Sequence, residues 1–308
     1  MDIGKAVINW LVAALLVSAF LFPASAVQTP SSIQIGTFNL EFFTDLDRST
    51  GGWCERHNHR GLEEIRELAA FIDSLDIEVL ALQEVEDEAA MELLVSFLPQ
   101  DKYGYLVIPQ EVPETCQKVA VLYQREEVML SYQGRIPLSL GRFGLRDGLV
   151  VYAKVLPNGF DFTLVVVHLK ASFDSRSRGI RARQLALLGD WVEGYLTDPS
   201  NDRDLVLAGD FNEHLLTNRR ALELLDHGEG LRVITEDVPD KDCAPPGRRW
   251  TDPIDHIVIS PGVQEYMGEA MLDNFFLDPS LPDRYSYSDH CVLWGDFDPA
   301  DLDPLSEP

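Results

Sequence analysis

Basic residues are scarce in this chain of 308 residues. It has 25 Lys and Arg residues against 51 Asp and Glu residues, so its formal net charge is −26. Proteins that bind nucleic acid mainly through a positive surface draw most of their affinity from Lys and Arg. The composition therefore argues against a general basic nucleic-acid binder. The 45% hydrophobic content also excludes a chain that is disordered throughout.

Long hydrophobic runs are also lacking, except at the N-terminus. Residues 6–22 are mostly apolar, follow Lys5, and precede Pro23 and the small residue Ala26. This pattern is typical of a secretory signal peptide, and we expect residues 1–26 to be removed. The alternative is an uncleaved membrane anchor, for which the run is near the lower length limit. The sequence thus predicts a secreted or periplasmic protein with no transmembrane segment after cleavage.

Only four cysteines are present. Export to an oxidising compartment permits disulfides, which a reducing compartment does not. Cys54 and Cys116 lie in polar, loop-like segments and are the favoured pair, whereas Cys291 lies in an apolar strand and is expected to be a buried thiol.

Strand-like and helix-like segments follow one another without a break. Helical spacing of apolar residues predicts helices over about 60–75, 88–98 and 178–196. Short apolar runs predict strands at 33–38, 77–83, 103–109, 119–123, 149–155, 162–169, 203–211, 255–260 and 291–297. The sequence predicts one α/β domain over residues 27–300, with its sheets covered by helices, and an acidic tail at 301–308.

Polar residues follow or enter the predicted strands. Rigid strand ends can hold such side chains in the fixed geometry that a site requires. Carboxylates with amides suit a hard cation such as Mg²⁺, Mn²⁺ or Ca²⁺ better than zinc. The residues concerned are Asn39, Glu41, Glu84, His168, Asp210, Asn212, Asp255, Asp289 and His290.

Six segments in this order resemble the endonuclease/exonuclease/phosphatase (DNase I-like) superfamily. They are TFNLEFF, LALQEVED, VVVHLKA, LAGDFN, PIDHIVIS and SDH, and the resemblance to a secreted bacterial-type member covers about residues 33–296. It implies a four-layer α/β (α+β) sandwich, in which two mixed β-sheets pack face to face with helices outside. It also implies a metal-dependent hydrolase of phosphoesters.

The resemblance implies roles for individual residues. Glu84 matches the magnesium-binding Glu, with Asn39 beside it and Asp289 and Glu41 as further metal candidates. The catalytic candidates are His168 as a phosphate contact, the pair Asp210 and Asn212, His290, and Asp255 as its hydrogen-bond partner. Either Asp210 or the His290–Asp255 pair is the base. Mg²⁺ is the expected cofactor, with Mn²⁺ or Ca²⁺ as alternatives.

The sequence departs from the family pattern at one position. Members most like DNase I carry a Glu that orients the histidine matched by His168, but Gln117 or Lys118 stands there in this chain. A general-acid role of the DNase type for His168 is therefore in doubt.

A local basic cluster follows His168. Arg side chains bind phosphate oxygens in a forked geometry, so the cluster is a candidate substrate clamp; its alternative is a solvated helix face. It comprises Lys170, Arg176, Arg178, Arg181 and Arg183, with Arg142 and Arg146 as weaker candidates.

The most favoured function is a secreted, divalent-metal-dependent nuclease or phosphodiesterase acting on DNA or RNA. The alternatives are a phosphatase or lipid phosphodiesterase of sphingomyelinase or inositol-phosphate type, and a non-catalytic binding protein with the same fold. No sequence feature predicts a stable protein partner. The identity of the phosphoester stays open at this point.

Overall fold

The computed structural model describes residues 31–45, 60–109, 115–238, 253–273, 288–300 and 302. The expected signal peptide, most of the acidic tail, Cys54 and Cys243 lie outside these ranges. Among the described residues, no helix is long and apolar enough to cross a membrane.

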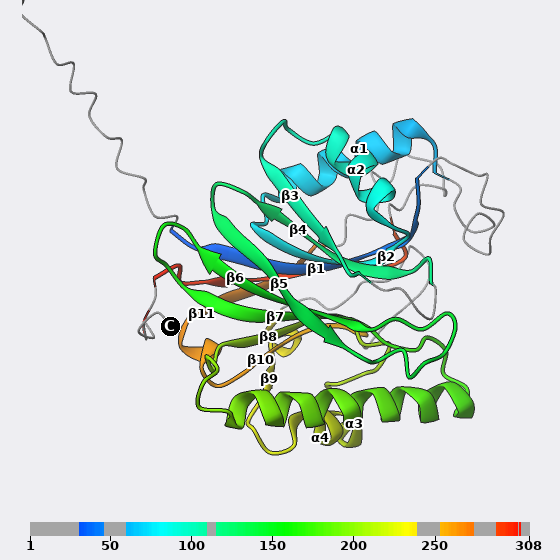
Figure 1. The fold of residues 1–308 in the computed structure, drawn as a ribbon, viewed down its shortest axis with the longest axis vertical. Coiled ribbons are helices and arrows are strands. Elements are labelled where there is room, and N and C mark those ends of the chain that lie inside the picture. Colours follow the sequence, from blue (N-terminus) through cyan, green and yellow to red (C-terminus); the bar gives the residue numbers. More distant parts are fainter. Residues whose placement is uncertain are drawn as a thin grey trace, which may run out of the picture.

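Two mixed sheets form the centre of the fold, as the family resemblance implies, and each has six strands (Figure 1). The first sheet has the order β11-β12-β1-β2-β4-β3 and the second the order β5-β6-β7-β8-β10-β9. The pairs β1·β2 and β7·β8 are parallel. The strands are β1 (Ile33–Phe43), β2 (Val79–Val85), β3 (Tyr103–Val107), β4 (Lys118–Gln124), β5 (Val128–Ile136), β6 (Gly148–Val155), β7 (Asp161–His168), β8 (Leu205–Asp210), β9 (Arg232–Val233), β10 (Asp255–Ile259), β11 (Met267–Asp273) and β12 (Val292–Phe297).

Helices cover the outer face of each sheet, completing four layers (Figure 1). Helices α1 (Leu62–Leu75) and α2 (Glu88–Ser96) pack on the first sheet, while α3 (Ser175–Thr197) and α4 (Arg219–Asp226) pack on the second. Two short 3₁₀ turns occupy Ile234–Asp237 and Val263–Glu265.

The central strands are buried on both faces because successive side chains point to opposite sides. In β2, Val79 and Ala81 face the core between the sheets, whereas Leu80 and Leu82 face α1 and α2. This double burial explains why residues 77–83 are apolar almost throughout.

Sequence patterns missed the peripheral elements. Strand β5 lies at a sheet edge and has mostly exposed or half-exposed residues, so it lacks a continuous apolar run. Strand β11 is also an edge strand, and α4 has only eight residues. Edge strands and short helices need fewer apolar residues because one side faces solvent.

Candidate active site

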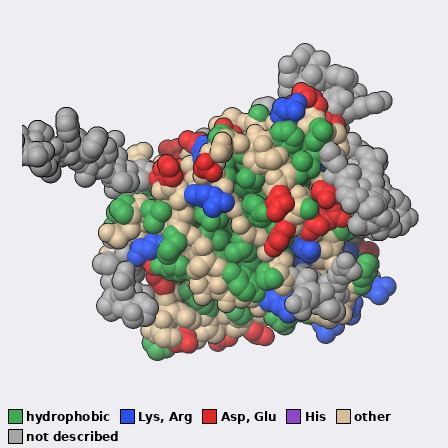
Figure 2. Space-filling view, turned by 45° about the horizontal axis from the view of Figure 1, so that its top comes forward, with side chains coloured by type: hydrophobic (Ala, Val, Ile, Leu, Met, Phe, Trp, Pro, Cys, Tyr) green, Lys and Arg blue, Asp and Glu red, His purple; other side chains and the backbone are tan. Residues whose placement is uncertain are grey.

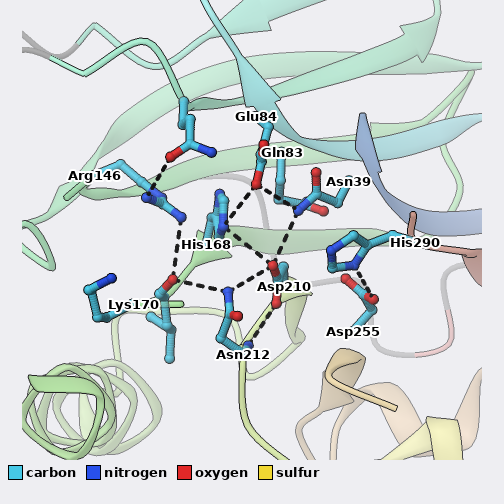
Figure 3. Close-up of polar contacts among 12 residues, drawn as sticks. Asn39, Gln83, Glu84, Arg146, His168, Lys170, Asp210, Asn212, Asp255 and His290 are labelled. Carbon is cyan, nitrogen blue, oxygen red and sulfur yellow. Dashed lines mark hydrogen bonds and ion pairs between the residues drawn. The ribbon is translucent and has the colours of Figure 1, made fainter. Parts of the chain in front are cut away.

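Strand register brings three predicted residues of the second sheet to one level. His168 at the end of β7 pairs with Asp210 at the end of β8, and Asp210 pairs with Asp255 at the start of β10. The three residues are far apart in the sequence but occupy neighbouring strands. They form one side of the site (Figure 3).

Asn39 and Glu84 form the opposite side, from strands β1 and β2 of the first sheet. The Asn39 Nδ2 donates to Asp210 Oδ2 at 3.2 Å and to Glu84 Oε1 at 3.4 Å. Because Asn39 is fully buried, this amide links the functional edges of the two sheets. The Glu84 carboxylate also accepts a hydrogen bond from the Phe42 backbone N–H at 2.9 Å.

The backbone is strained where these side chains enter the site. Glu41, Phe42, Glu84 and Asn212 all have positive φ, between 47° and 61°. Non-glycine residues avoid this region unless the surroundings enforce it, at a cost of about 1–3 kcal/mol each. The register of β1 and β2 is irregular between Asn39 and Phe43, in the stretch that contains Glu41 and Phe42 and lies opposite Glu84.

The GDFN segment places the second carboxylate. A Cβ at Gly209 would lie 2.0 Å from the Val167 carbonyl oxygen, so only glycine allows β7 and β8 to approach this closely. Asp210 accepts from the Asn212 backbone N–H at 2.7 Å and from its side-chain amide at 2.8 Å. Burial, together with the charge of Asp255, raises the pKa of Asp210 to about 7.

His168 is a neutral imidazole in this environment. Burial, followed by the charges of Arg146 and His290, holds its pKa well below the usual range. Its Nε2 lies 3.3 Å from Asp210 Oδ2 and 3.7 Å from Glu84 Oε1, while its Nδ1 is buried without a hydrogen-bond partner.

Gln117, one of the two residues that the sequence places at the position of the family Glu, bonds to Arg146 and not to His168. Gln117 lines the site, and its Oε1 accepts from Arg146 instead, at 3.4 Å. The Arg146 guanidinium also donates to the backbone oxygens of Gly144 and Leu169, but its Nε is buried and unpaired. Burial lowers the pKa of Arg146 to about 10, so it remains a cation at neutral pH.

His290 is the positively charged histidine of the site. Its Nδ1 lies 2.7 Å from Asp255 Oδ2 (Figure 3). Burial alone would disfavour the imidazolium, but the charges of Asp255, Asp210 and Asp289 outweigh it and hold the pKa of His290 well above its usual range. The site thus holds one neutral and one charged histidine on either side of Asp210.

Carboxylates gather where the sequence predicts a metal. The pKa of Glu41 is raised by burial and by the charges of Asp289 and Glu84. Arg60 donates to the Glu41 backbone oxygen at 2.7 Å, so one cation of the chain already lies here. Mutual repulsion of carboxylates next to an amide oxygen favours a hard divalent cation.

A second group of ligand atoms lies beside the first. One atom each of Asp210, Asp255 and His290 lie within 4.8 Å of one another, and Asp255 Oδ1 is buried without a hydrogen-bond partner. Because His290 is protonated here and cannot ligate a cation, the carboxylates and amide around Glu84 remain the donor set that fits Mg²⁺ or Mn²⁺.

One cavity of about 770 Å³ contains the predicted catalytic residues. It is lined by Glu41, Glu84, His168, Asp210, Asn212, Asp255, Asp289 and His290, together with Gln117, Arg146, Lys170, Phe143 and Phe173. Asn39 is not among the lining residues, but its amide donates hydrogen bonds to two of them, Glu84 and Asp210.

The structure separates the predicted phosphate-binding cluster. Lys170 lines the cavity. Arg181 is fully buried, pairs with Glu213 at 2.9 Å and donates to the backbone oxygens of Lys170 and Ser172. It therefore supports the loop that carries Lys170. The remaining members of the cluster, Arg176, Arg178 and Arg183, are exposed on α3 and do not line the cavity, and neither does Arg142.

Two cysteines flank the site. Cys116 precedes Gln117 and Cys291 follows His290, and both are disulfide-bonded. The expectation that Cys291 is a thiol is therefore wrong, although the residue is buried. Its apolar neighbours predicted burial but carry no information about a bonding partner. The predicted pairing of Cys54 with Cys116 involves a residue outside the described ranges.

Comparison with known proteins agrees with the fold and the motif order. The sequence model of the Endonuclease/Exonuclease/phosphatase family matches residues 36–290. No curated protein matches the sequence significantly.

Solved structures share the fold at low sequence identity. A mannosyl-6-phosphatase of Bacteroides thetaiotaomicron has a TM-score of 0.64 at 17% identity, covering 86% of this chain and 99% of its own. The human Nocturnin catalytic domain has a TM-score of 0.60 at 19% identity, covering 87% and 93%. TDP2 of D. rerio, complexed with a single-strand DNA product, has a TM-score of 0.61 at 15% identity, covering 87% and 99%.

Proposed function

Because the chain belongs to the Endonuclease/Exonuclease/phosphatase family, whose members are metal-dependent phosphoester hydrolases, we propose that it hydrolyses nucleic-acid phosphodiester bonds with Mg²⁺ as cofactor. The observation that carries this proposal is the convergence of Asp210, a neutral His168 and a charged His290 in one cavity with the carboxylates Glu84 and Glu41.

Asp210 is the general base of the proposed reaction. Its raised pKa of about 7 lets it accept a proton from water near neutral pH. Asn212 holds the Asp210 carboxylate through two hydrogen bonds and fixes its direction. The attacking water would lie beside this carboxylate, opposite the leaving oxygen.

His290 and His168 bind the phosphate oxygens. Asp255 occupies the Nδ1 of His290, which leaves its Nε2 to donate to a non-bridging oxygen that gains charge in the transition state. Arg146 and Lys170 add positive charge at the same cavity. A divalent cation held by Glu84, with Asn39, Glu41 and Asp289 around it, would neutralise further charge on the phosphate.

A phosphoester panel tests the proposed function. The purified protein is assayed with single-stranded DNA, plasmid DNA, RNA, sphingomyelin vesicles and a sugar phosphate, each with Mg²⁺, Mn²⁺, Ca²⁺ or EDTA. We expect cleavage of nucleic acid that requires metal. Release of inorganic phosphate from the sugar phosphate, with nucleic acid left intact, would contradict it.

Variants show whether the observed activity belongs to this site. Glu84→Ala and His290→Ala should each abolish most turnover while the fold is retained. His227→Ala is the matched control, since His227 also pairs with a carboxylate, Glu193 at 3.2 Å, but lies outside the cavity. Equal activity in all three variants would assign the hydrolysis to a contaminant or to another site.

We also propose that residues 1–26 direct secretion and are cleaved after Ala26, as their composition indicates. Expression of the full chain, followed by N-terminal sequencing of the extracellular or periplasmic protein, tests this. A mature form beginning at Val27 is expected, and an uncleaved protein in the membrane fraction would refute it.

A further inference from the structure

Two phenylalanines at the cavity have no part in the chemistry described above. Phe143 is 82% exposed and Phe173 is 41% exposed, and both line the cavity. Burying a Phe side chain is worth about 1.5–3 kcal/mol, so leaving two exposed at one site forgoes substantial stabilisation. Exposed apolar side chains beside a polar site are typical of ligand-binding surfaces.

Phe173 is held in place before any ligand arrives. Its ring stacks on His214 at a centroid distance of 5.3 Å and an interplanar angle of 10°. The Arg181 guanidinium lies 5.2 Å from the ring centroid and is itself held by Glu213. Binding of a ligand to this ring therefore costs little conformational entropy of the protein, because the side chain is already ordered.

Phe143 projects from a tight turn tied to the site. Gly141 and Gly144 on either side of it have φ of 67° and 73°, which favour glycine, and an added Cβ at either would meet no atom within 4 Å. The turn is anchored two residues further on, where Arg146 enters the phosphate-binding part of the cavity. The ring therefore lines the same cavity as Arg146 while remaining open to solvent.

The cavity lining has few basic side chains with which to bind the phosphates of a long polyanion. Among the described residues, Arg146 and Lys170 are the Arg and Lys side chains that line it. On the face drawn in Figure 2, acidic and basic side chains both appear among hydrophobic ones. Duplex binding through phosphates depends on several such contacts. Stacking of a base on an aromatic ring supplies about 1–3 kcal/mol without them.

We propose that Phe143 and Phe173 hold an unpaired nucleobase next to the scissile phosphate, so that the enzyme prefers single-stranded to duplex nucleic acid. The proposal rests on the proposed nuclease function and specifies its substrate. A base stacked inside a duplex cannot present its face to these rings, so an annealed strand has to open first.

The experiment compares three substrates that share the same phosphodiester bonds. They are an oligothymidylate, the same strand annealed to its complement, and an abasic strand in which tetrahydrofuran replaces each nucleoside. We expect wild-type kcat/KM to be highest on the single strand. Phe143→Ala and Phe173→Ala should each lower it about 5- to 150-fold there, the equivalent of 1–3 kcal/mol, and less than twofold on the abasic strand.

Two further variants control for the chemistry of the side chain. Phe143→Leu keeps an apolar side chain without a ring and should lose most of the base-dependent rate. Tyr132→Ala removes another exposed aromatic ring, 44% exposed on β5 and outside the cavity, and should leave all three rates unchanged.

The outcomes separate this inference from the proposed function. If the wild type cleaves none of the nucleic-acid substrates with any metal, the proposed function fails. If it cleaves them but the Phe variants lose equal rates on the base-bearing and abasic strands, base binding is overturned. A loss confined to sphingomyelin vesicles would overturn it too, by assigning the two rings to a membrane surface.

Discussion

Replacing Asp255 with Asn tests the central electrostatic arrangement of the site. The substitution keeps the size and an acceptor for the His290 Nδ1 but removes the negative charge 2.7 Å away. The side chains of His290 and Asp255 are only 15% and 14% exposed, so solvent screens the pair weakly. A hydrogen bond between charged groups contributes about 1.5–3 kcal/mol. If the hydrogen bond between Asp255 and His290 stabilises the transition state by this amount, its weakening should lower kcat about 10- to 150-fold.

The pH profile distinguishes loss of charge from misfolding. Without Asp255 the pKa of His290 should fall, so the imidazolium is lost at a lower pH. The alkaline limb of kcat should therefore move to lower pH, and an NMR titration of the His290 ring should show the same shift.

The assay is single-stranded DNA hydrolysis at saturating Mg²⁺. Glu193→Gln is the matched control, because it removes the carboxylate beside His227 on the surface, 3.2 Å from Nδ1, and should change kcat less than twofold. Activity of Asp255→Asn within threefold of wild type, or full recovery of it at higher Mg²⁺, would refute the reasoning. The second result would make Asp255 a metal ligand rather than the partner of His290.

Three other substitutions test single contacts. Glu84→Gln should lower metal-dependent turnover by about 10²-fold, since metal charge stabilisation is worth several kcal/mol, while the melting temperature in EDTA is unchanged; a normal rate would exclude Glu84 as a ligand. Arg181→Met leaves Glu213 without its buried partner and should cost about 3–5 kcal/mol in urea unfolding, whereas Arg183→Gln should stay within 0.5 kcal/mol. His256 has its pKa lowered by burial to about 4, so the unfolded state takes up its proton first as the pH falls below about 6.5. Because of this group, the free energy of unfolding should decrease by about 2 kcal/mol between pH 7 and pH 5. The variant His256→Gln should lack that part of the pH dependence. Identical slopes of unfolding free energy against pH in the two proteins would contradict the prediction.

Much of the fold can be predicted from the sequence because its signals are local. The double burial of the central strands makes β2 and β7 nearly continuous apolar runs, and α1 and α3 show helical spacing. The four-layer arrangement followed from the motif order. The edge strands β5 and β11 could not be predicted in the same way, because half of their surroundings is solvent and their composition resembles that of loops.

The residues of the candidate site also differ in whether the sequence could predict them. Asn39, Glu84 and Asp210 could be chosen from the sequence because each follows an apolar run within a recognisable motif, whereas their meeting across two sheets could not be predicted. The role of Arg181 could not be predicted from the sequence, because its side chain is buried against Glu213, which lies 32 residues further along the chain. The proximity of Arg60 to the carboxylates also had no signal in the chain.

The sequence by itself determined the central strands and the polar residues that follow them, because these depend on neighbouring residues in the chain, and the order of its motifs indicated the reaction class. The tertiary structure decided which charges meet: the contact between Asn39 and Asp210 joins residues 171 positions apart. It also placed Phe143 and Phe173 at the same cavity and left Arg176, Arg178 and Arg183 outside it. The charge states of His168 and His290 differ for the same reason, because burial and neighbouring charges are set by the packing of two sheets.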